Sequence, residues 1–223
     1  MTLMSFCEMF GTVTGAIAGA TASTRVRMDL FGVVTCGTVC ALGGGTLRDL
    51  LMGHATPVFW VADDGVHFLY YALVTSFLTF FITRVWKLPM GTVRIADAFT
   101  LALFTMIGTE KAMGLGASAS VAILMGICTG VAGGVLRDLA TGNVPYVFRP
   151  GELYATASFV GASGFILSLH FGASPNAAYI IGLLTVFIVR MGAIWWHWSL
   201  PSYQPLFEVQ PQEEEETSQP IKP

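Results

Sequence analysis

Charge is scarce in this chain of 223 residues. Only 11% of the residues are charged, whereas soluble domains carry about 25%. Hydrophobic residues make up 54% and the mean hydropathy is +0.67, so the composition excludes a water-soluble fold and predicts an integral membrane protein. The formal net charge of -3 depends on one acidic run, Glu213 to Glu216, within a Pro-, Gln- and Glu-rich tail that we expect to be disordered and solvated.

Cysteine is also sparse, and its four positions argue against a secreted disulfide scaffold, because all of them lie in apolar segments. Cys36 and Cys40 are one helical turn apart, but no His or acidic residue is spaced beside them, so we interpret them as packing residues. The motifs of metallohydrolases, serine acyl transferases and P-loop nucleotide-binding proteins are missing from the chain. We therefore expect a non-enzyme with no metal, no cofactor and no nucleic-acid partner.

Long apolar runs are what the sequence does contain. A helix of roughly 20 residues crosses a hydrocarbon core about 30 Å thick, and runs of this length recur along the chain. They predict an all-α membrane protein with seven transmembrane helices. The expected spans are Met4 to Ala22, Asp29 to Met52, Val66 to Val85, Val93 to Met113, Ser118 to Thr141, Glu152 to His170 and Asn176 to Trp198.

One polar segment occurs twice within these apolar runs, 89 positions apart. We call the two copies, residues 43–53 and 132–142, the Arg-Asp signatures. The same shift aligns Glu8 with Asp97, and Asp29 with Ser118 as two expected helix N-caps. Each repeat then holds three spans, and an odd number of crossings inverts the second repeat in the membrane. The expected boundaries are 1–88 for the first repeat, 89–172 for the inverted repeat, 173–200 for the seventh helix and 201–223 for the cytoplasmic tail.

The basic residues predict the orientation of the chain in a cell inner membrane. Positive residues favour the cytoplasmic side, and only Arg48 and Lys111 would lie toward the outside if the N-terminus is outside and the C-terminus inside. The basic residues that this orientation places toward the cytoplasm are Arg25, Arg27, Arg84, Lys87, Arg94, Arg137, Arg149, Arg190 and Lys222.

The two signatures are the candidate site. Arg48 follows Asp29 by 19 residues, or about 28 Å of helix, which predicts Arg48 and Asp49 near the outer face. Inversion then places Arg137 and Asp138 near the inner face. The glycines are expected to interrupt or bend the helices and expose backbone oxygens between the two charged pairs. These glycines are Gly43, Gly44, Gly45, Gly133 and Gly134.

A structural alternative remains for each of these residues. The arginines could simply brace neighbouring helices, and the glycines could serve close helix packing. Adjacent residues point about 100° apart on a helix, so we expect that each Arg and its Asp do not face the same seam. Glu8 and Asp97 could serve the pathway, or each could accept a bond from a signature arginine.

These residues resemble a known family. The paired Gly-Gly-x-Leu-Arg-Asp-Leu segments, the run from Arg27 to Gly32 and the layout of three, three and one spans look like the bacterial branch of the trimeric intracellular cation (TRIC) channels, also described as glycine-transporter-like. The resemblance covers about Phe6 to Trp198. It implies a homotrimer in the lipid bilayer, each protomer with its own pore through the bent second and fifth spans, passing potassium, sodium and other monovalent cations.

One departure from the family pattern limits this resemblance. Animal members carry a Lys-Glu-Val motif tied to lipid and gating, whereas this chain has Glu110-Lys111-Ala112, so that lipid site is not carried over. Three functions stay open on the residues alone: a monovalent cation channel, a secondary transporter of a small amino acid such as glycine, and a non-transporting membrane scaffold.

Overall fold

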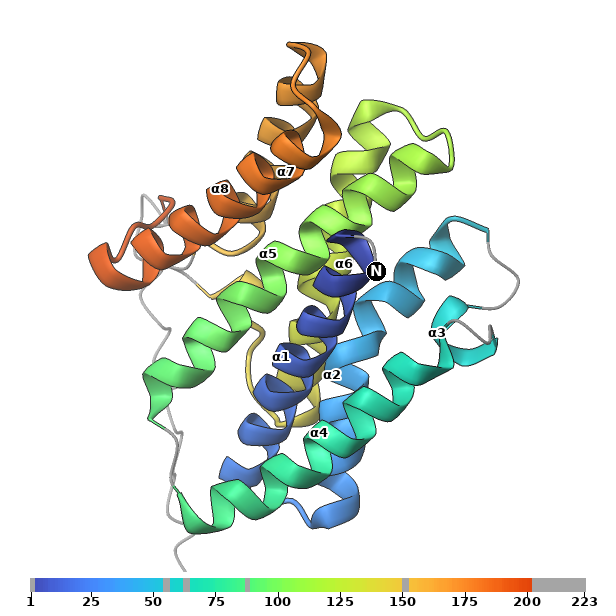
Figure 1. The fold of residues 1–223 in the computed structure, drawn as a ribbon. Coiled ribbons are helices and arrows are strands. Elements are labelled where there is room, and N and C mark those ends of the chain that lie inside the picture. The colour runs from blue at the N-terminus through green and yellow to red at the C-terminus, as the bar shows by residue number, and fades with distance from the viewer. Residues whose placement is uncertain (1–2, 54–56, 62–64, 87–88, 150–152, 202–223) are drawn as a thin grey trace, which may run out of the picture.

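Seven long helices form the body of the molecule in the computed structural model, which describes residues 3–53, 57–61, 65–86, 89–149 and 153–201 (Figure 1). Within these ranges every expected span is a helix, and no strand occurs. The expected tail lies outside the described residues, apart from Pro201. The long helices are α1 (Leu3–Arg25), α2 (Leu30–Leu51), α4 (Val66–Val85), α5 (Met90–Gly114), α6 (Ala119–Ala140), α7 (Ala155–His170) and α8 (Pro175–Trp196), with a short α3 (Val58–Val61) and a 3-10 turn η1 (Tyr146–Phe148) between them.

Local sequence explains where these helices begin and end. The Asp29 side chain accepts a hydrogen bond of 2.7 Å from the amide of Gly32, as expected of an N-cap. Ser118 occupies the expected N-cap position of α6, but its side chain makes no capping hydrogen bond, and its hydroxyl lies 3.2 Å from that of Ser120. Four helices are followed by a glycine with positive φ, which stops the helix without a Cβ clash. These glycines are Gly53, Gly116, Gly142 and Gly172.

The helices pack as two groups of three with α8 added on one side. Helices α1, α2 and α4 contact one another, as do α5, α6 and α7, while α8 packs on α5 and α7 (Figure 1). The two groups meet where α1 packs on α5 and α2 packs on α6. This arrangement is the one expected of two related three-helix units.

Equivalent glycines make equivalent contacts in the two groups. A Cβ on Gly19 would meet Cys40, and a Cβ on Gly108 would meet Thr129. Both members of the second contact lie 89 residues beyond their counterparts in the first. The repeat therefore extends from the sequence to the helix packing.

The two groups run in opposite directions. Along α2 from Cys40 to Gly44, the facing residue on α6 runs backward from Gly133 to Thr129, so these equivalent helices are antiparallel. A hydrogen bond of 2.9 Å joins Thr100 on α5 to Thr14 on α1 at the other contact between the groups. The antiparallel crossing agrees with the inverted architecture expected from the sequence.

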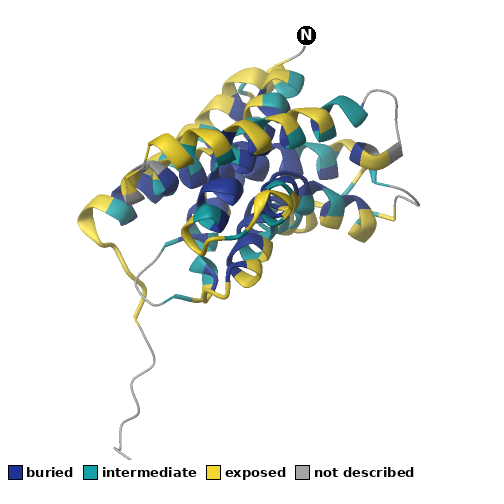
Figure 2. Cartoon of the chain, turned by 90° about the horizontal axis from the view of Figure 1, so that it is seen from below, coloured by how far each residue is buried: buried dark blue, intermediate teal, exposed yellow. Residues whose placement is uncertain are grey.

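Buried residues lie where the helices face one another, and exposed residues lie on their outer sides (Figure 2). Many of the exposed residues are large and hydrophobic, while the interior holds polar residues such as Thr12, Thr105 and Ser158 beside the hydrophobic core. Five of the described helices are long and apolar enough to span a bilayer; α5 carries four charged residues and α7 has only 16 residues. Exposed tryptophans lie near helix ends, where a membrane–water interface favours them. The exposed tryptophans are Trp60, Trp86, Trp195, Trp196 and Trp198.

Candidate functional site

The two Arg-Asp signatures lie on opposite sides of the α2–α6 crossing. Arg48 is one turn beyond Gly44 on α2, and Arg137 is one turn beyond Gly133 on α6. Because the helices are antiparallel, the two arginines are about 18 Å apart along the α2 axis at 1.5 Å per residue. The two charged pairs therefore lie toward opposite ends of the α2–α6 pair, while their assignment to the outer and inner membrane faces stays a prediction.

In the first signature the neighbouring Arg48 and Asp49 pair with each other. Both are almost fully buried, at 2% and 3% exposure. Arg48 Nε and Nη2 donate to Asp49 Oδ1 at 2.9 and 2.6 Å. The expectation that adjacent residues on a helix cannot share a seam is wrong here, because the long arginine side chain folds back across the 100° between them. A buried guanidinium beside a carboxylate avoids the cost of an isolated charge.

In the second signature Arg137 contacts two carboxylates. Its Nε donates to Asp138 Oδ1 at 2.8 Å, and its Nη1 donates to Asp97 Oδ1 from α5. Asp138 Oδ2 also accepts the amide of Tyr146, at 3.0 Å, which ties η1 to the end of α6. Asp97 thus accepts a bond from a signature arginine, as one of the two interpretations anticipated.

Glu8 does not repeat that arrangement. It forms an ion pair with Lys111 at the end of α5, and no bond from Arg48 to Glu8 is found among the described residues. The position equivalent to Lys111 in the first repeat is Ala22. One lysine without a counterpart therefore makes the two ends of the molecule chemically different.

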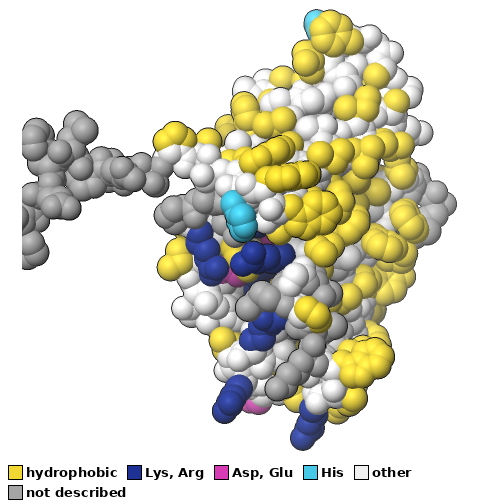
Figure 3. Space-filling view, turned by 90° about the vertical axis from the view of Figure 1, so that its left-hand side faces the viewer, with side chains coloured by type: hydrophobic (Ala, Val, Ile, Leu, Met, Phe, Trp, Pro, Cys, Tyr) yellow, Lys and Arg dark blue, Asp and Glu magenta, His cyan; other side chains and the backbone are white. Residues whose placement is uncertain are grey.

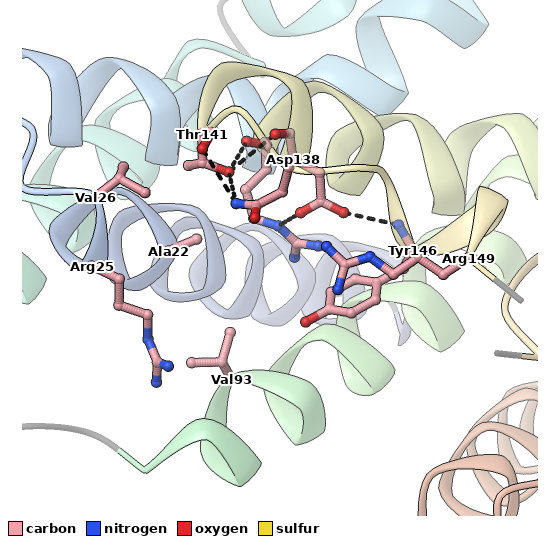
Figure 4. Close-up of a pocket in the computed structure, with 10 residues that line it drawn as sticks. Ala22, Arg25, Val26, Val93, Asp138, Thr141, Tyr146 and Arg149 are labelled. Carbon is pink, nitrogen blue, oxygen red and sulfur yellow. Dashed lines mark hydrogen bonds and ion pairs between the residues drawn. The ribbon is translucent and has the colours of Figure 1, made fainter. Parts of the chain in front are cut away.

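Each signature lines a cavity. At the end that holds the first signature, a cavity of about 460 Å³ is lined by Arg48, Asp49, Glu110, Lys111 and the apolar or small residues Met4, Gly114 and Leu115. We call it the α2-end cavity. At the opposite end a cavity of about 240 Å³, here the α6-end cavity, is lined by residues of α1, α5, α6 and the loop after α6. Figure 4 shows Asp138, Tyr146 and Arg149 on one side of it, with Arg25, Val26 and Val93 on the other.

Buried polar atoms at both signatures lack a hydrogen-bond partner among the described residues. They are Arg48 Nη1, Arg137 Nη2 and Asp97 Oδ2. Such atoms are costly unless water or a solute reaches them. Two of them belong to residues at a cavity wall, because Arg48 lines the α2-end cavity and Arg137 lines the α6-end cavity.

The signature glycines do not interrupt their helices. Residues 43–45 and 133–134 lie within continuous α-helix, so an interruption there is wrong, while a bend at these glycines stays a prediction. A Cβ on Gly44 would overlap the carbonyl oxygen of Thr129, and a Cβ on Gly133 would overlap that of Cys40. These two glycines let the helix backbones approach closely, which is the packing role held as the alternative.

Gly43, Gly45 and Gly134 each face a large side chain. A Cβ on Gly43 would overlap Leu136, and one on Gly45 would overlap the Phe59 ring. At Gly134 the nearest atom is the Tyr154 hydroxyl, and Arg137 and Asp97 lie within 4 Å of the same point. The absence of a side chain at these glycines, on both α2 and α6, leaves room for the large side chains that face them.

Sequence reasoning missed four residues that the fold brings to these clusters. Lys111 was expected only to lie toward the outside, and Tyr146, Tyr154 and Arg190 had no assigned site role. The sequence indicated one of the four, because Arg190 is a charged residue inside an apolar span. Among the described residues no group of His, Cys, Asp and Glu is arranged to hold a metal ion.

The chain is similar in sequence to a known family and to bacterial membrane proteins. A model of the family described as glycine transporter matches residues 5–84 and 94–170, one segment in each half of the chain. A UPF0126 membrane protein of Vibrio cholerae is 40% identical over 207 residues, which cover 90% of this chain and 83% of that protein. The UPF0126 inner membrane protein YadS of Escherichia coli is 37% identical over 203 residues, covering 90% and 96%.

Solved structures give the same result at the level of the fold. The trimeric intracellular cation channel orthologue from Rhodobacter sphaeroides aligns with a TM-score of 0.81 and 36% identity, over 87% of this chain and 99% of that chain. This chain belongs to the TRIC channel family. A second TRIC cation channel structure aligns with a TM-score of 0.81 and 28% identity, over 92% of this chain and 98% of the other. The names of the relatives and the apolar helices support a multi-pass TRIC-family protein of the inner membrane.

Proposed function

We propose that this chain is a potassium-permeable channel for monovalent cations. In this proposal it assembles as a homotrimer in which each protomer has its own pore, running along α2 and α6 between the two cavities. The observation that carries the proposal is the placement of one buried Arg-Asp pair in a cavity at each end of the α2–α6 crossing. The likeness to TRIC cation channels over nearly the whole chain supports the same function.

The two signature arginines have acidic partners, although Arg25 and Arg149 also line the α6-end cavity. Each signature arginine has a carboxylate beside it, and Arg137 has two, so the guanidinium charge is balanced by acidic partners close by. A cation that enters either cavity then meets carboxylate oxygens as well as arginine. Arg48 Nη1 and Arg137 Nη2 lack a partner among the described residues and belong to residues of the two cavity walls, so in this proposal water in the pathway is their expected partner.

Secondary transport of a small neutral amino acid such as glycine is the second candidate. The description of the matching family model favours it. Two related three-helix units in opposite orientation also suit alternating access, in which one unit rocks against the other. Both candidates use the α2–α6 crossing, but only a channel opens a continuous path for ions.

Recordings from purified protein in planar bilayers test the proposal. We expect unitary currents in symmetric potassium, a reversal potential that follows the potassium gradient, and currents in sodium as well. Uptake of radiolabelled glycine into vesicles of the same preparation is the matched measurement. Concentrative glycine uptake without unitary currents would overturn the channel and favour the transporter.

We further propose that the N-terminus lies outside and the C-terminus in the cytoplasm. Lys and Arg side chains gather in the lower part of the face drawn in Figure 3, while hydrophobic side chains dominate above. Arg25 and Arg27 end α1, and Arg84 and Arg94 flank the turn from α4 to α5, at the end that carries the α6-end cavity. The excess of positive charge favours this end for the cytoplasm.

A further inference from the structure

Helix α8 lies beyond both segments matched by the family model, yet it places a buried arginine beside the second signature. Arg190 is 0% exposed, and its guanidinium carbon lies 4.9 Å from the centre of the Tyr154 ring and 5.9 Å from that of Tyr146. Its Nη1 donates to the carbonyl of Leu153 at 3.4 Å. A buried guanidinium over aromatic faces makes cation–π contacts that are strongest when water is excluded.

The two tyrosines connect Arg190 to the α6-end cavity. Their rings stack with centres 6.3 Å apart, at an interplanar angle of 28°. The Tyr146 amide is bonded to Asp138, and the Tyr146 ring also lies 4.4 Å from the guanidinium of Arg149. Tyr146 and Arg149 both line the cavity, whereas Arg190 does not. The segment 143–149 is therefore held between the end of α6 and the side chain of α8.

The equivalent place at the other end is built differently. The Phe59 ring lies against Gly45, the counterpart of Gly134, and Lys111 Nζ lies 5.9 Å from the centre of that ring. Lys111 comes from α5, and its side chain is 25% exposed. A buried cation supplied by α8 is thus found only at the α6 end of the described molecule.

We propose that Arg190 is a positioning residue that holds segment 143–149 docked beside the α6-end cavity and thereby favours the closed state of the pathway. This inference rests on the proposed channel function. Tyr146 and Arg149 form part of the cavity wall, so the position of the segment sets how open that end is. Loss of the Arg190 contacts shifts the docking equilibrium on the order of tenfold toward release.

The test compares Arg190→Gln with two matched variants. Arg190→Lys keeps a cation over the tyrosine rings, and Arg84→Gln removes an exposed arginine from α4. Hydrogen–deuterium exchange of the amides in 143–149 reports docking, and single-channel recording reports open probability and unit conductance. For Arg190→Gln we expect exchange about tenfold faster and a higher open probability at unchanged unit conductance. We expect Arg190→Lys to restore both in large part and Arg84→Gln to match the wild type.

Two results overturn the proposal: exchange of 143–149 in Arg190→Gln equal to wild type, or a lowered unit conductance at unchanged open probability. If Arg190→Gln does not assemble, Tyr146→Leu removes the ring that receives the cation, and exchange equal to wild type in that variant overturns the proposal equally. Absence of currents from the wild type refutes the channel function, while the exchange measurement still decides whether Arg190 holds the segment.

Discussion

Gly44 on α2 packs directly against the carbonyl oxygen of Thr129 on α6, with no room for a Cβ between them. The contact recurs in inverted form as Gly133 against Cys40, with each residue replaced by its equivalent from the other repeat. The crossing of the two central helices is therefore held at backbone contact by a glycine from each side. Any side chain at either position must separate the helices between the two cavities.

Alanine at the crossing should destabilise the protein. Gly44→Ala and Gly133→Ala each force a Cβ into a backbone carbonyl, and we expect a loss of about 1–3 kcal/mol in the free energy of unfolding. Denaturation in detergent micelles measures it. Gly164→Ala in α7 is the matched control, because nothing lies within 4 Å of its Cβ position and alanine is the better helix former. Equal stability of Gly44→Ala and the control would show that the crossing is loose.

The aspartates of the signatures are expected to brace their arginines. Asp49→Asn removes the carboxylate paired with the buried Arg48, and we expect a loss of about 3–5 kcal/mol of stability. Asp138→Asn should cost less, because Arg137 keeps its ion pair with Asp97. Thermal unfolding in detergent measures the loss. Asp29→Asn is the control, since asparagine caps a helix as well as aspartate does.

Conductance of the same variants separates bracing from attraction of cations. If the aspartates mainly concentrate cations at the mouths, stability stays near wild type and unit conductance falls more at low salt than at high salt, because exposed charges are screened within about 10 Å at 0.1 M. That combination would contradict the bracing role. The fold assignment does not depend on this outcome.

The Glu8–Lys111 pair should couple α1 to the end of α5. The Lys111 side chain is 25% exposed and that of Glu8 is 11% exposed, so we expect a coupling energy of about 1 kcal/mol from the double-mutant cycle of Glu8→Gln and Lys111→Met. The coupling should shrink as salt is raised, because part of the pair is in water. Additive effects of the two single changes would mean that the pair contributes nothing to stability.

Reporter fusions test the orientation. A cytoplasm-active reporter joined after Leu200 should give signal, and a periplasm-active reporter at the same site should not, because the excess of basic residues favours the cytoplasm for that end. A fusion after Gly116, between α5 and α6, should behave in the opposite way. The reverse pattern at both sites would invert the proposed topology.

Sequence alone determined the seven helices and their repeat. Apolar length is a local property that the bilayer thickness sets, and all seven expected spans correspond to helices of the structure. The shift of 89 residues was legible because the glycines and charges that it aligns stand out against an apolar background.

Tertiary structure decided which residues meet. The partner of Glu8 is Lys111, which has no counterpart in the first repeat, and Arg48 folds back onto its own neighbour Asp49. The glycine pattern predicted interrupted helices. Gly44 and Gly133 instead let the backbone of the facing helix approach closely. Pairing and close approach depend on the distance between helices and on the reach of long side chains, and these follow from how the two repeats and α8 pack together.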